Sequence, residues 1–119
     1  MNYFNEGNKF YNSHDYEKAI AYYKKSASEN INKACSYYNC GVCFIKLKSF
    51  DDAIIMLNKA ISISHESKYF FNLGYCYVMK ECFDTALRLF NLAWSIDPDD
   101  KDCEKAIDVI ISKFQKKVN

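Results

Sequence analysis

Hydrophobic residues recur along the chain at intervals of three and four, in short blocks separated by polar turns. One pair of neighbouring blocks holds Tyr37, Cys40, Phe44 and Leu47 and then Ile54, Leu57 and Ile61. This spacing places apolar side chains along one face of an α-helix. Because the polar turn between the two blocks, around Lys48 and Ser49, is short, the pattern predicts two antiparallel helices that pack side by side.

The three glycines of the chain, Gly7, Gly41 and Gly74, divide this pattern into copies. Each glycine has an aromatic residue four positions before it and another three positions after it, followed by an aromatic and an alanine at nine and twelve positions. Four positions beyond each alanine comes a large apolar residue: Tyr23, Leu57 and Phe90. Since Gly and Ala lack side-chain bulk, we expect them where the two helices of a copy cross, with aromatic rings filling the space beside them.

This frame resembles the tetratricopeptide repeat, whose signature combines an aromatic, Leu-Gly, an aromatic, Ala, an aromatic and Pro within 34 residues. The third copy is the most similar and contains Phe70, Leu73, Gly74, Tyr77, Ala86, Phe90, Ala93 and Pro98. The other copies depart modestly, with Glu6 and Cys40 where Leu is usual. The resemblance implies an all-α fold of about seven helices, arranged as a right-handed superhelix of antiparallel helix pairs.

We expect one domain over residues 1–119, with repeats at 1–33, 34–66 and 67–100 and a capping helix at 101–118. The last segment lacks the glycine frame but keeps one apolar stripe, formed by Cys103, Ala106, Ile107, Ile110, Phe114 and Val118. Its polar side chains are predicted to form the outer surface that ends a stack of repeats: Lys105, Asp108, Lys113, Lys116 and Lys117.

In this family the first helices of the repeats line a concave groove that binds peptides. The resemblance assigns twelve residues to that groove: Phe4, Asn5, Asn8, Tyr11, Tyr38, Asn39, Val42, Lys46, Lys68, Phe71, Asn72 and Tyr75. Aromatic rings, amides and lysines without a carboxylate favour a partner with apolar anchors and a modest negative charge. The alternative is that several of these aromatic residues pack against neighbouring repeats or the capping helix.

Asparagine occupies the same place in all three repeats, at Asn5, Asn39 and Asn72, two positions before each glycine. We therefore expect a row of amides along the groove. An amide can pair with both the N–H and the C=O of a bound backbone, so such a row holds a peptide without reading its side chains.

Co-chaperones of the family that this chain resembles hold the acidic C-terminal tails of heat-shock chaperones with a clamp of Lys, Asn, Asn, Lys and Arg. Here Asn8, Asn39 and Lys68 match the clamp, but Phe4 stands in place of the first Lys and Asn72 in place of the Arg. Two of the three cations are missing, and with them most of the charge-assisted hydrogen bonds to a carboxylate. Binding of an acidic tail is therefore the weaker alternative.

Cys40 and Cys43 form a CxxC pair, and Cys76 takes the repeat position of Cys43. This spacing occurs in redox pairs and in half of a zinc site. Both residues lie in mid-helix, however, and the two histidines belong to turns away from them, so a fourth ligand is missing. We predict buried, unreactive thiols without metal or cofactor, with a metal or redox role as the alternative, and we expect Cys82, in a turn, to be the most reactive.

The composition narrows the function further. Lys and Arg number 16 and Asp and Glu 15, so the chain lacks the excess of basic residues that is typical of a nucleic-acid binder. No apolar run approaches 18 residues, and the chain does not begin with a basic region followed by an apolar one. We therefore expect a cytoplasmic protein without a membrane segment. Phosphate loops, nucleophile elbows and paired catalytic carboxylates are also absent from the sequence, so no enzyme is predicted.

The sequence thus predicts a protein-interaction module, or scaffold, that holds a peptide segment of an unidentified partner protein in its groove. The alternative from another class is a structural protein that assembles with itself, through its Tyr and Phe surface or the helix ending at Val118. A monomer is favoured, and a homo-oligomer remains open.

Overall fold

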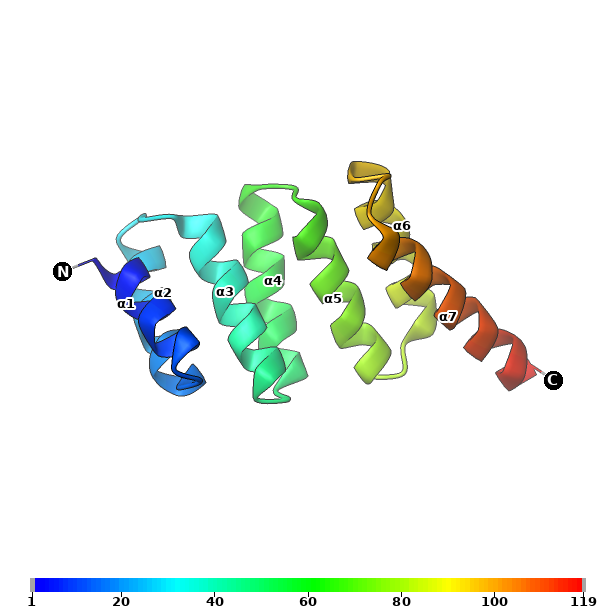
Figure 1. Cartoon of the computed structure of the whole chain (residues 1–119), viewed down its shortest axis with the longest axis horizontal. Helices are drawn as coiled ribbons and strands as arrows, with labels where there is room; N and C mark the ends of the chain where they lie inside the picture. The colour runs from blue at the N-terminus through cyan, green and yellow to red at the C-terminus, as the bar shows by residue number, and fades with distance from the viewer. Residues whose placement is uncertain (1, 119) are drawn as a thin grey trace. The chain divides into compact units, whose positions relative to one another are not determined.

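The computed structural model describes the backbone of residues 2–118 and the side chains of residues 2–113. Its helices are α1 (Tyr3–Asn12), α2 (Tyr16–Ser28), α3 (Lys33–Lys46), α4 (Phe50–Ile63), α5 (Ser67–Met79), α6 (Phe83–Ile96) and α7 (Lys101–Val118), as Figure 1 shows. Residues 2–118 contain no strand, which confirms the all-α prediction. None of the helices in this part of the chain combines the length and hydropathy needed to cross a bilayer.

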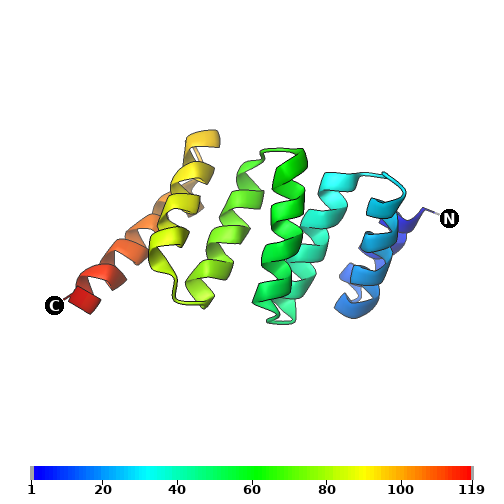
Figure 2. The same ribbon diagram turned by 180° about the vertical axis from the view of Figure 1, so that it is seen from behind.

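The chain forms two compact units, unit 1 (Met1–His65) and unit 2 (Glu66–Asn119). In unit 1, α1 packs on α2, α2 on α3 and α3 on α4, and Figure 2 shows these helices from behind. The core of unit 1 gathers Ala19, Ile20, Tyr23, Cys40, Cys43 and Met56. Aromatic side chains from α1, α2 and α3 pack around these residues, as the repeat pattern predicts.

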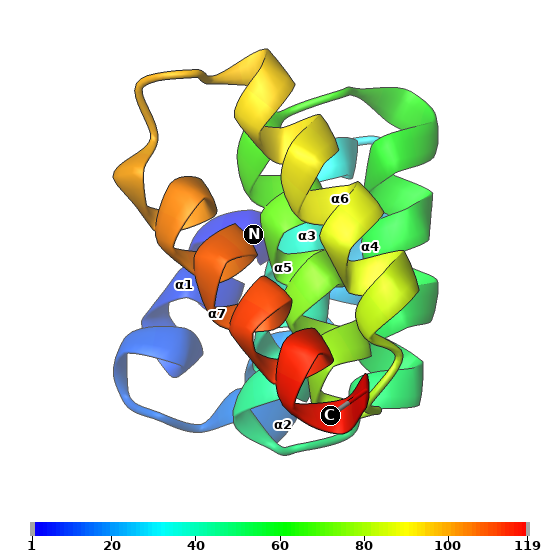
Figure 3. The same ribbon diagram turned by 90° about the vertical axis from the view of Figure 1, so that its right-hand side faces the viewer.

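In unit 2, α5 packs on α6 and α6 on α7, and Figure 3 shows α7 running obliquely beside α6. The core of this unit contains Ala86, Phe90, Ile107 and Ile110, so the apolar stripe of the last helix is buried here as predicted. The side chains of Phe114 and Val118, which the sequence places on the same stripe, lie outside the described residues.

The two helices of each pair are joined by the same turn in all three copies. Its middle residue has a left-handed backbone, with φ values of 61° at His14, 61° at Lys48 and 59° at Glu81. The next residue donates its backbone N–H, at 2.8 Å in every copy, to the carbonyl oxygen five positions earlier. This bond closes the first helix in a Schellman motif, and the same residue is the N-cap of the second helix. One short turn therefore reverses the chain and makes the two helices antiparallel.

The glycines lie where the helices of each pair cross. A Cβ added to Gly7 would stand 2.6 Å from Cδ1 of Tyr23, closer than carbon atoms approach without displacement. A Cβ added to Gly41 would stand 2.8 Å from Cγ of Leu57, and a Cβ added to Gly74 would stand 2.9 Å from Cε1 of Phe90. The three glycines therefore meet the three large apolar residues that the repeat frame places four positions after its alanines.

Replacing Gly7 with Ala tests this crossing. Alanine improves helix propensity by about 1 kcal/mol, but overpacking a core costs about 1–3 kcal/mol. The flat Tyr23 ring lies directly against the new methyl group, so we expect a net loss of stability for Gly7→Ala in urea denaturation followed by circular dichroism. The control Asn5→Ala, on the exposed face of the same helix, should not lose stability. A Gly7→Ala protein as stable as the wild type would contradict the packing described here.

Candidate functional site

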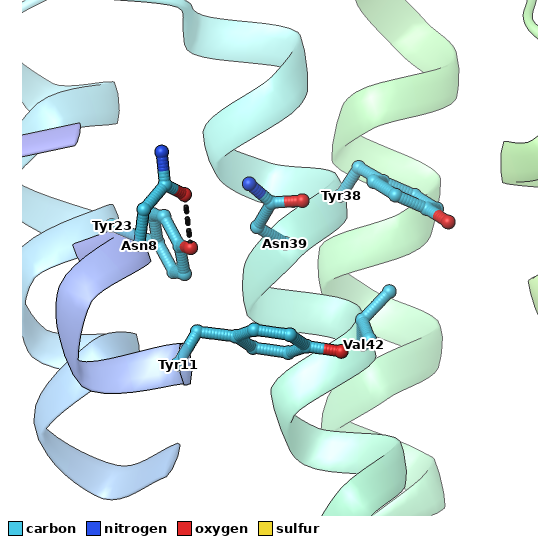
Figure 4. Close-up of a pocket in the computed structure, with 6 residues that line it drawn as sticks. All are labelled: Asn8, Tyr11, Tyr23, Tyr38, Asn39 and Val42. Atoms are coloured by element: carbon cyan, nitrogen blue, oxygen red, sulfur yellow. Dashed lines mark hydrogen bonds between the residues drawn. The ribbon is translucent and has the colours of Figure 1, made fainter. Parts of the chain in front are cut away.

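Unit 1 contains a cavity of about 220 Å³ between α1, α2 and α3. It is lined by Asn8 and Tyr11 of α1, Tyr23 of α2, and Tyr38, Asn39 and Val42 of α3, which Figure 4 shows in close-up. We call it the amide cavity, after its two asparagines. All six lining residues belong to unit 1.

The crossing at Gly7 positions one wall of the amide cavity. Because Gly7 has no side chain, the Tyr23 ring lies across α1 and is only 1% exposed. Its hydroxyl group donates a hydrogen bond of 2.5 Å to Oδ1 of Asn8. Figure 4 shows the result: Nδ2 of Asn8, the donor end of the amide, points away from Tyr23.

The amide cavity carries no formal charge at neutral pH. Burial raises the pKa of Tyr23, and Cys43 and Tyr11 nearby raise it further, while a hydrogen bond from the Asn39 side chain acts in the opposite direction. Tyr23 therefore remains a neutral phenol that donates to Asn8. In Figure 4 the amide nitrogen of Asn39 lies on the side of Asn8 and Tyr23, and its oxygen lies on the side of Tyr38. The lining thus offers both donors and acceptors.

Five of the twelve predicted groove residues line the amide cavity: Asn8, Tyr11, Tyr38, Asn39 and Val42. Three others from unit 1 do not. Phe4 packs against Tyr23, with 5.8 Å between the ring centroids, and Asn5 and Lys46 are exposed on α1 and at the end of α3.

The remaining four predicted groove residues lie in unit 2. Phe71 and Tyr75 line a second cavity, and Lys68 is exposed on α5. The side chain of Asn72 donates a 2.9 Å hydrogen bond to the carbonyl oxygen of Lys68, one turn earlier on its own helix. Of the three asparagines predicted to form a row, Asn39 lines the amide cavity.

The repeat pattern does not predict two features of the cavities. It places Tyr23 at a packing position, and the signal for a further role is its hydroxyl group, which the equivalent residues Leu57 and Phe90 lack. It also predicts Lys105 and Lys113 on the polar outer face of the last helix, but both line the cavity of unit 2. Helical periodicity marks them as polar without showing that their stems lie along an apolar wall.

The thiols lie where the repeat pattern placed them. Cys40, Cys43 and Cys76 are fully buried, as predicted, and burial raises the pKa of each to about 12. Burial also raises the pKa of Cys103 to about 11. Cys82 is exposed, as expected for a turn residue. Among the described residues, no three His, Cys, Asp or Glu side chains are grouped so that they could hold a metal ion.

Residues 34–65, the segment spanning α3 and α4, match the family model of the tetratricopeptide repeat. The chain therefore contains a tetratricopeptide repeat. No curated protein sequence matches it significantly. The tetratricopeptide repeat (TPR) match covers one repeat, and solved structures show that the fold extends over the rest of the chain.

Three solved TPR structures illustrate the shared fold. The TPR domain of Arabidopsis OM64 has a TM-score of 0.85 and 23% identity, over 91% of this chain and 90% of that one. The second TPR domain of human RPAP3, in complex with an HSP70 peptide, has a TM-score of 0.86 and 21% identity over 92% of both chains. The first TPR of Spaghetti, bound to an HSP90 peptide, has a TM-score of 0.90 and 18% identity, over 95% of this chain and 90% of that one.

The buried thiols predict how stability depends on pH. In the unfolded chain a thiol ionises near its usual pKa of about 8.5, whereas the folded state keeps Cys43 protonated up to a pKa of about 12. Above pH 8.5 the unfolded state therefore binds fewer protons than the folded state, and the free energy of unfolding falls as pH rises. Urea denaturation under reducing conditions between pH 8 and pH 10.5 should show this decline.

Two cysteine variants separate the contribution of a buried thiol to this decline from that of other groups that lose protons at alkaline pH. Cys43→Ala should have a shallower decline than the wild type, because one buried thiol is gone. Cys82→Ala, which removes an exposed thiol, should keep the wild-type slope. Equal slopes for all three proteins would contradict the assigned burial of Cys43.

Proposed function

We propose that this TPR protein is an interaction module that holds a peptide segment of a partner protein, with the amide cavity as an anchor point. The observation that carries the proposal is the pair of amides, Asn8 and Asn39, in an uncharged cavity walled by tyrosines. At about 220 Å³ the cavity is smaller than the roughly 300–1,000 Å³ typical of small-molecule sites. Its size suits one residue of a polypeptide chain.

The chemistry of the amide cavity suits a peptide backbone. An asparagine side chain both donates and accepts, so it can pair with a backbone C=O and N–H at the same residue. The hydrogen bond from Tyr23 fixes the orientation of the Asn8 amide before a ligand arrives, which lowers the entropy lost on binding. The rings of Tyr11 and Tyr38 add apolar surface for the side chain of the bound residue.

The solved relatives support peptide binding as the class of function, since human RPAP3 and Spaghetti carry HSP70 and HSP90 peptides on this fold. An acidic C-terminal tail remains the weaker choice for this chain. Phe4, which stands in place of the first clamp lysine, packs against the Tyr23 ring, and Asn72 stands in place of the clamp arginine. An uncharged peptide residue suits the neutral lining of the amide cavity better.

Removing the Asn39 amide tests the proposed anchor. A peptide selected by the wild-type protein from a random displayed library is measured by calorimetry against each variant. Two neutral hydrogen bonds of about 1 kcal/mol each correspond to a loss of at least tenfold in affinity, which we expect for Asn39→Ala. Val42→Trp, which fills the amide cavity, should also abolish binding.

The matched control is Asn5→Ala, at the same repeat position but exposed and outside the amide cavity. It should bind within about twofold of the wild type, with unchanged helicity in all variants. Failure to select any peptide, or selected peptides that bind Asn39→Ala as tightly as the wild type, would refute the proposed anchor.

Self-assembly is the second candidate, favoured by exposed apolar side chains in unit 2. Leu92 and Ile96, one turn apart on α6, are 47% and 44% exposed, and Trp94 is 37% exposed. Exposed apolar side chains that share a helix face, as Leu92 and Ile96 do, can form part of an interface. Light scattering across a range of concentrations separates the two candidates. We expect the mass of one chain throughout; a mass that rises with concentration and falls again in Leu92→Lys with Ile96→Lys would favour self-assembly.

A further inference from the structure

One side of the α1–α2 pair carries a row of three aromatic rings. The ring of Tyr22 on α2 lies beside two rings of α1, 6.2 Å from the centroid of Tyr3 and 5.3 Å from that of Phe10. At one end of the row, Nζ of Lys25 lies 5.4 Å from the Tyr3 centroid. At the other end, Nζ of Lys18 lies 5.4 Å from the Phe10 centroid. We call this surface the aromatic face; its residues are Tyr3, Glu6 and Phe10 of α1 and Lys18, Tyr22 and Lys25 of α2.

The repeat pattern shows what covers the equivalent surface of the second repeat. The residues 34 positions after Tyr3, Glu6 and Phe10 are Tyr37, Cys40 and Phe44 of α3. Helix α2 covers this surface of α3, because Sγ of Cys40 lies 3.8 Å from the carbonyl oxygen of Ile20. In addition, Nζ of Lys24 lies 5.6 Å from the centroid of Phe44. Among the described helices, none takes the corresponding place on α1, which packs on α2 (Figure 2). The second repeat therefore indicates that a helix has the shape that fits the aromatic face.

A carboxylate lies on the same stripe of α1 as two of the rings. Glu6 is three positions after Tyr3 and four before Phe10, so the three side chains share one side of the helix. Oε1 of Glu6 lies 4.0 Å from Nζ of Lys9, whose side chain is 75% exposed, and such a surface pair contributes little. The equivalent Cys40 donates its thiol toward a helix carbonyl, whereas a carboxylate only accepts. A covering helix therefore needs a cation opposite Glu6.

The two lysines of the aromatic face select the opposite charge. Lys18 lies over its ring as Lys24 of the covering helix does in the second repeat. A lysine of a covering helix would be repelled there, and a carboxylate would be attracted. The ion pair of Lys18 with Asp15, at 3.9 Å, is exposed and of the weak surface kind. Lys18 and Lys25 are seven positions apart, about 10.5 Å at 1.5 Å per residue, so carboxylates at i and i+7 of another helix match both.

We propose that the aromatic face binds an amphipathic helix of a partner protein, packed on α1 as α2 packs on α3. That helix carries a cation opposite Glu6 and, two turns apart, carboxylates that pair with Lys18 and Lys25. Its apolar side chains lie on the rings of the row, which are half-buried and partly open to solvent. The aromatic face shares no residue with the amide cavity, so this inference goes beyond the proposed anchor and stands if that anchor fails.

The probe is a synthetic peptide with the sequence of residues 15–28, the α2 segment, carrying Ile20→Arg and Lys24→Glu. Together with the native Glu17, these changes place a cation three positions after the first carboxylate and a second carboxylate seven positions after it. A side-chain staple on the solvent side keeps the peptide helical, because isolated helices of this length are marginal. The unmodified α2 peptide with the same staple is the matched control.

Titration of the full chain, followed by ¹⁵N–¹H spectra, measures the affinity of both peptides. We expect the charge-changed peptide to bind about tenfold more tightly than the control, since exposed ion pairs of modest strength replace two repulsive contacts. The shifted backbone amides should be those around Tyr3, Phe10 and Tyr22. Binding should persist in Asn39→Ala, which separates the aromatic face from the amide cavity.

Charge exchange in the protein separates recognition from folding. Lys18→Glu with Lys25→Glu should weaken binding of the charge-changed peptide at least tenfold, and should tighten binding of a version with Lys at both carboxylate positions. The matched control, Lys105→Glu with Lys113→Glu, makes the same change at two exposed lysines of unit 2 and should leave the affinity within about twofold. Circular dichroism should give the same helicity for every variant.

Equal affinity for the two α2 peptides, no rescue by the basic version, or shifts confined to the amide cavity would each overturn this assignment. So would a mass of two chains without peptide that returns to one chain in Lys18→Glu with Lys25→Glu, because a second copy would then occupy the aromatic face.

Discussion

Each repeat of this chain depends on contact between the bare backbone of a glycine and one large side chain of the partner helix. Tyr23, Leu57 and Phe90 each occupy the space that a Cβ at the facing glycine would need. The fully buried Ala19, Ala53 and Ala86 lie one helical turn before these large residues. Without side chains in the way, the helices of a pair approach closely enough to exclude water, and aromatic rings fill the remaining space.

In unit 1 this packing contact also shapes the amide cavity. The ring of Tyr23 satisfies the crossing at Gly7, and its hydroxyl group emerges beside Asn8, where it fixes an amide. The equivalent residues, Leu57 and Phe90, fill their crossings without a polar end. Tyr23 therefore contributes both to the stability of the first helix pair and to the hydrogen bonding in the amide cavity. The polar wall of this cavity depends on the crossing at Gly7.

Much of the fold follows from the sequence because it depends on short-range periodicity. Three- and four-residue spacing predicts the helices, and the spacing of Gly41 from Leu57 predicts their crossing. The position of a polar side-chain atom is harder to predict, because periodicity shows which face of a helix a residue occupies but not where the end of its long side chain lies. The hydroxyl of Tyr23 and the stems of Lys105 and Lys113 are examples. So is Asn72, whose amide donates to its own helix although it holds the same repeat position as Asn39.

The side-chain amide signals of Asn8 and Asn39 report directly on whether the amide cavity holds a peptide backbone. In ¹⁵N–¹H spectra each asparagine NH₂ group gives a pair of peaks that responds to new hydrogen bonds. With a bound peptide, we predict large shifts for the NH₂ peaks of Asn8 and Asn39 and unchanged peaks for Asn5. Unmoved Asn8 and Asn39 peaks under saturating peptide would contradict the account.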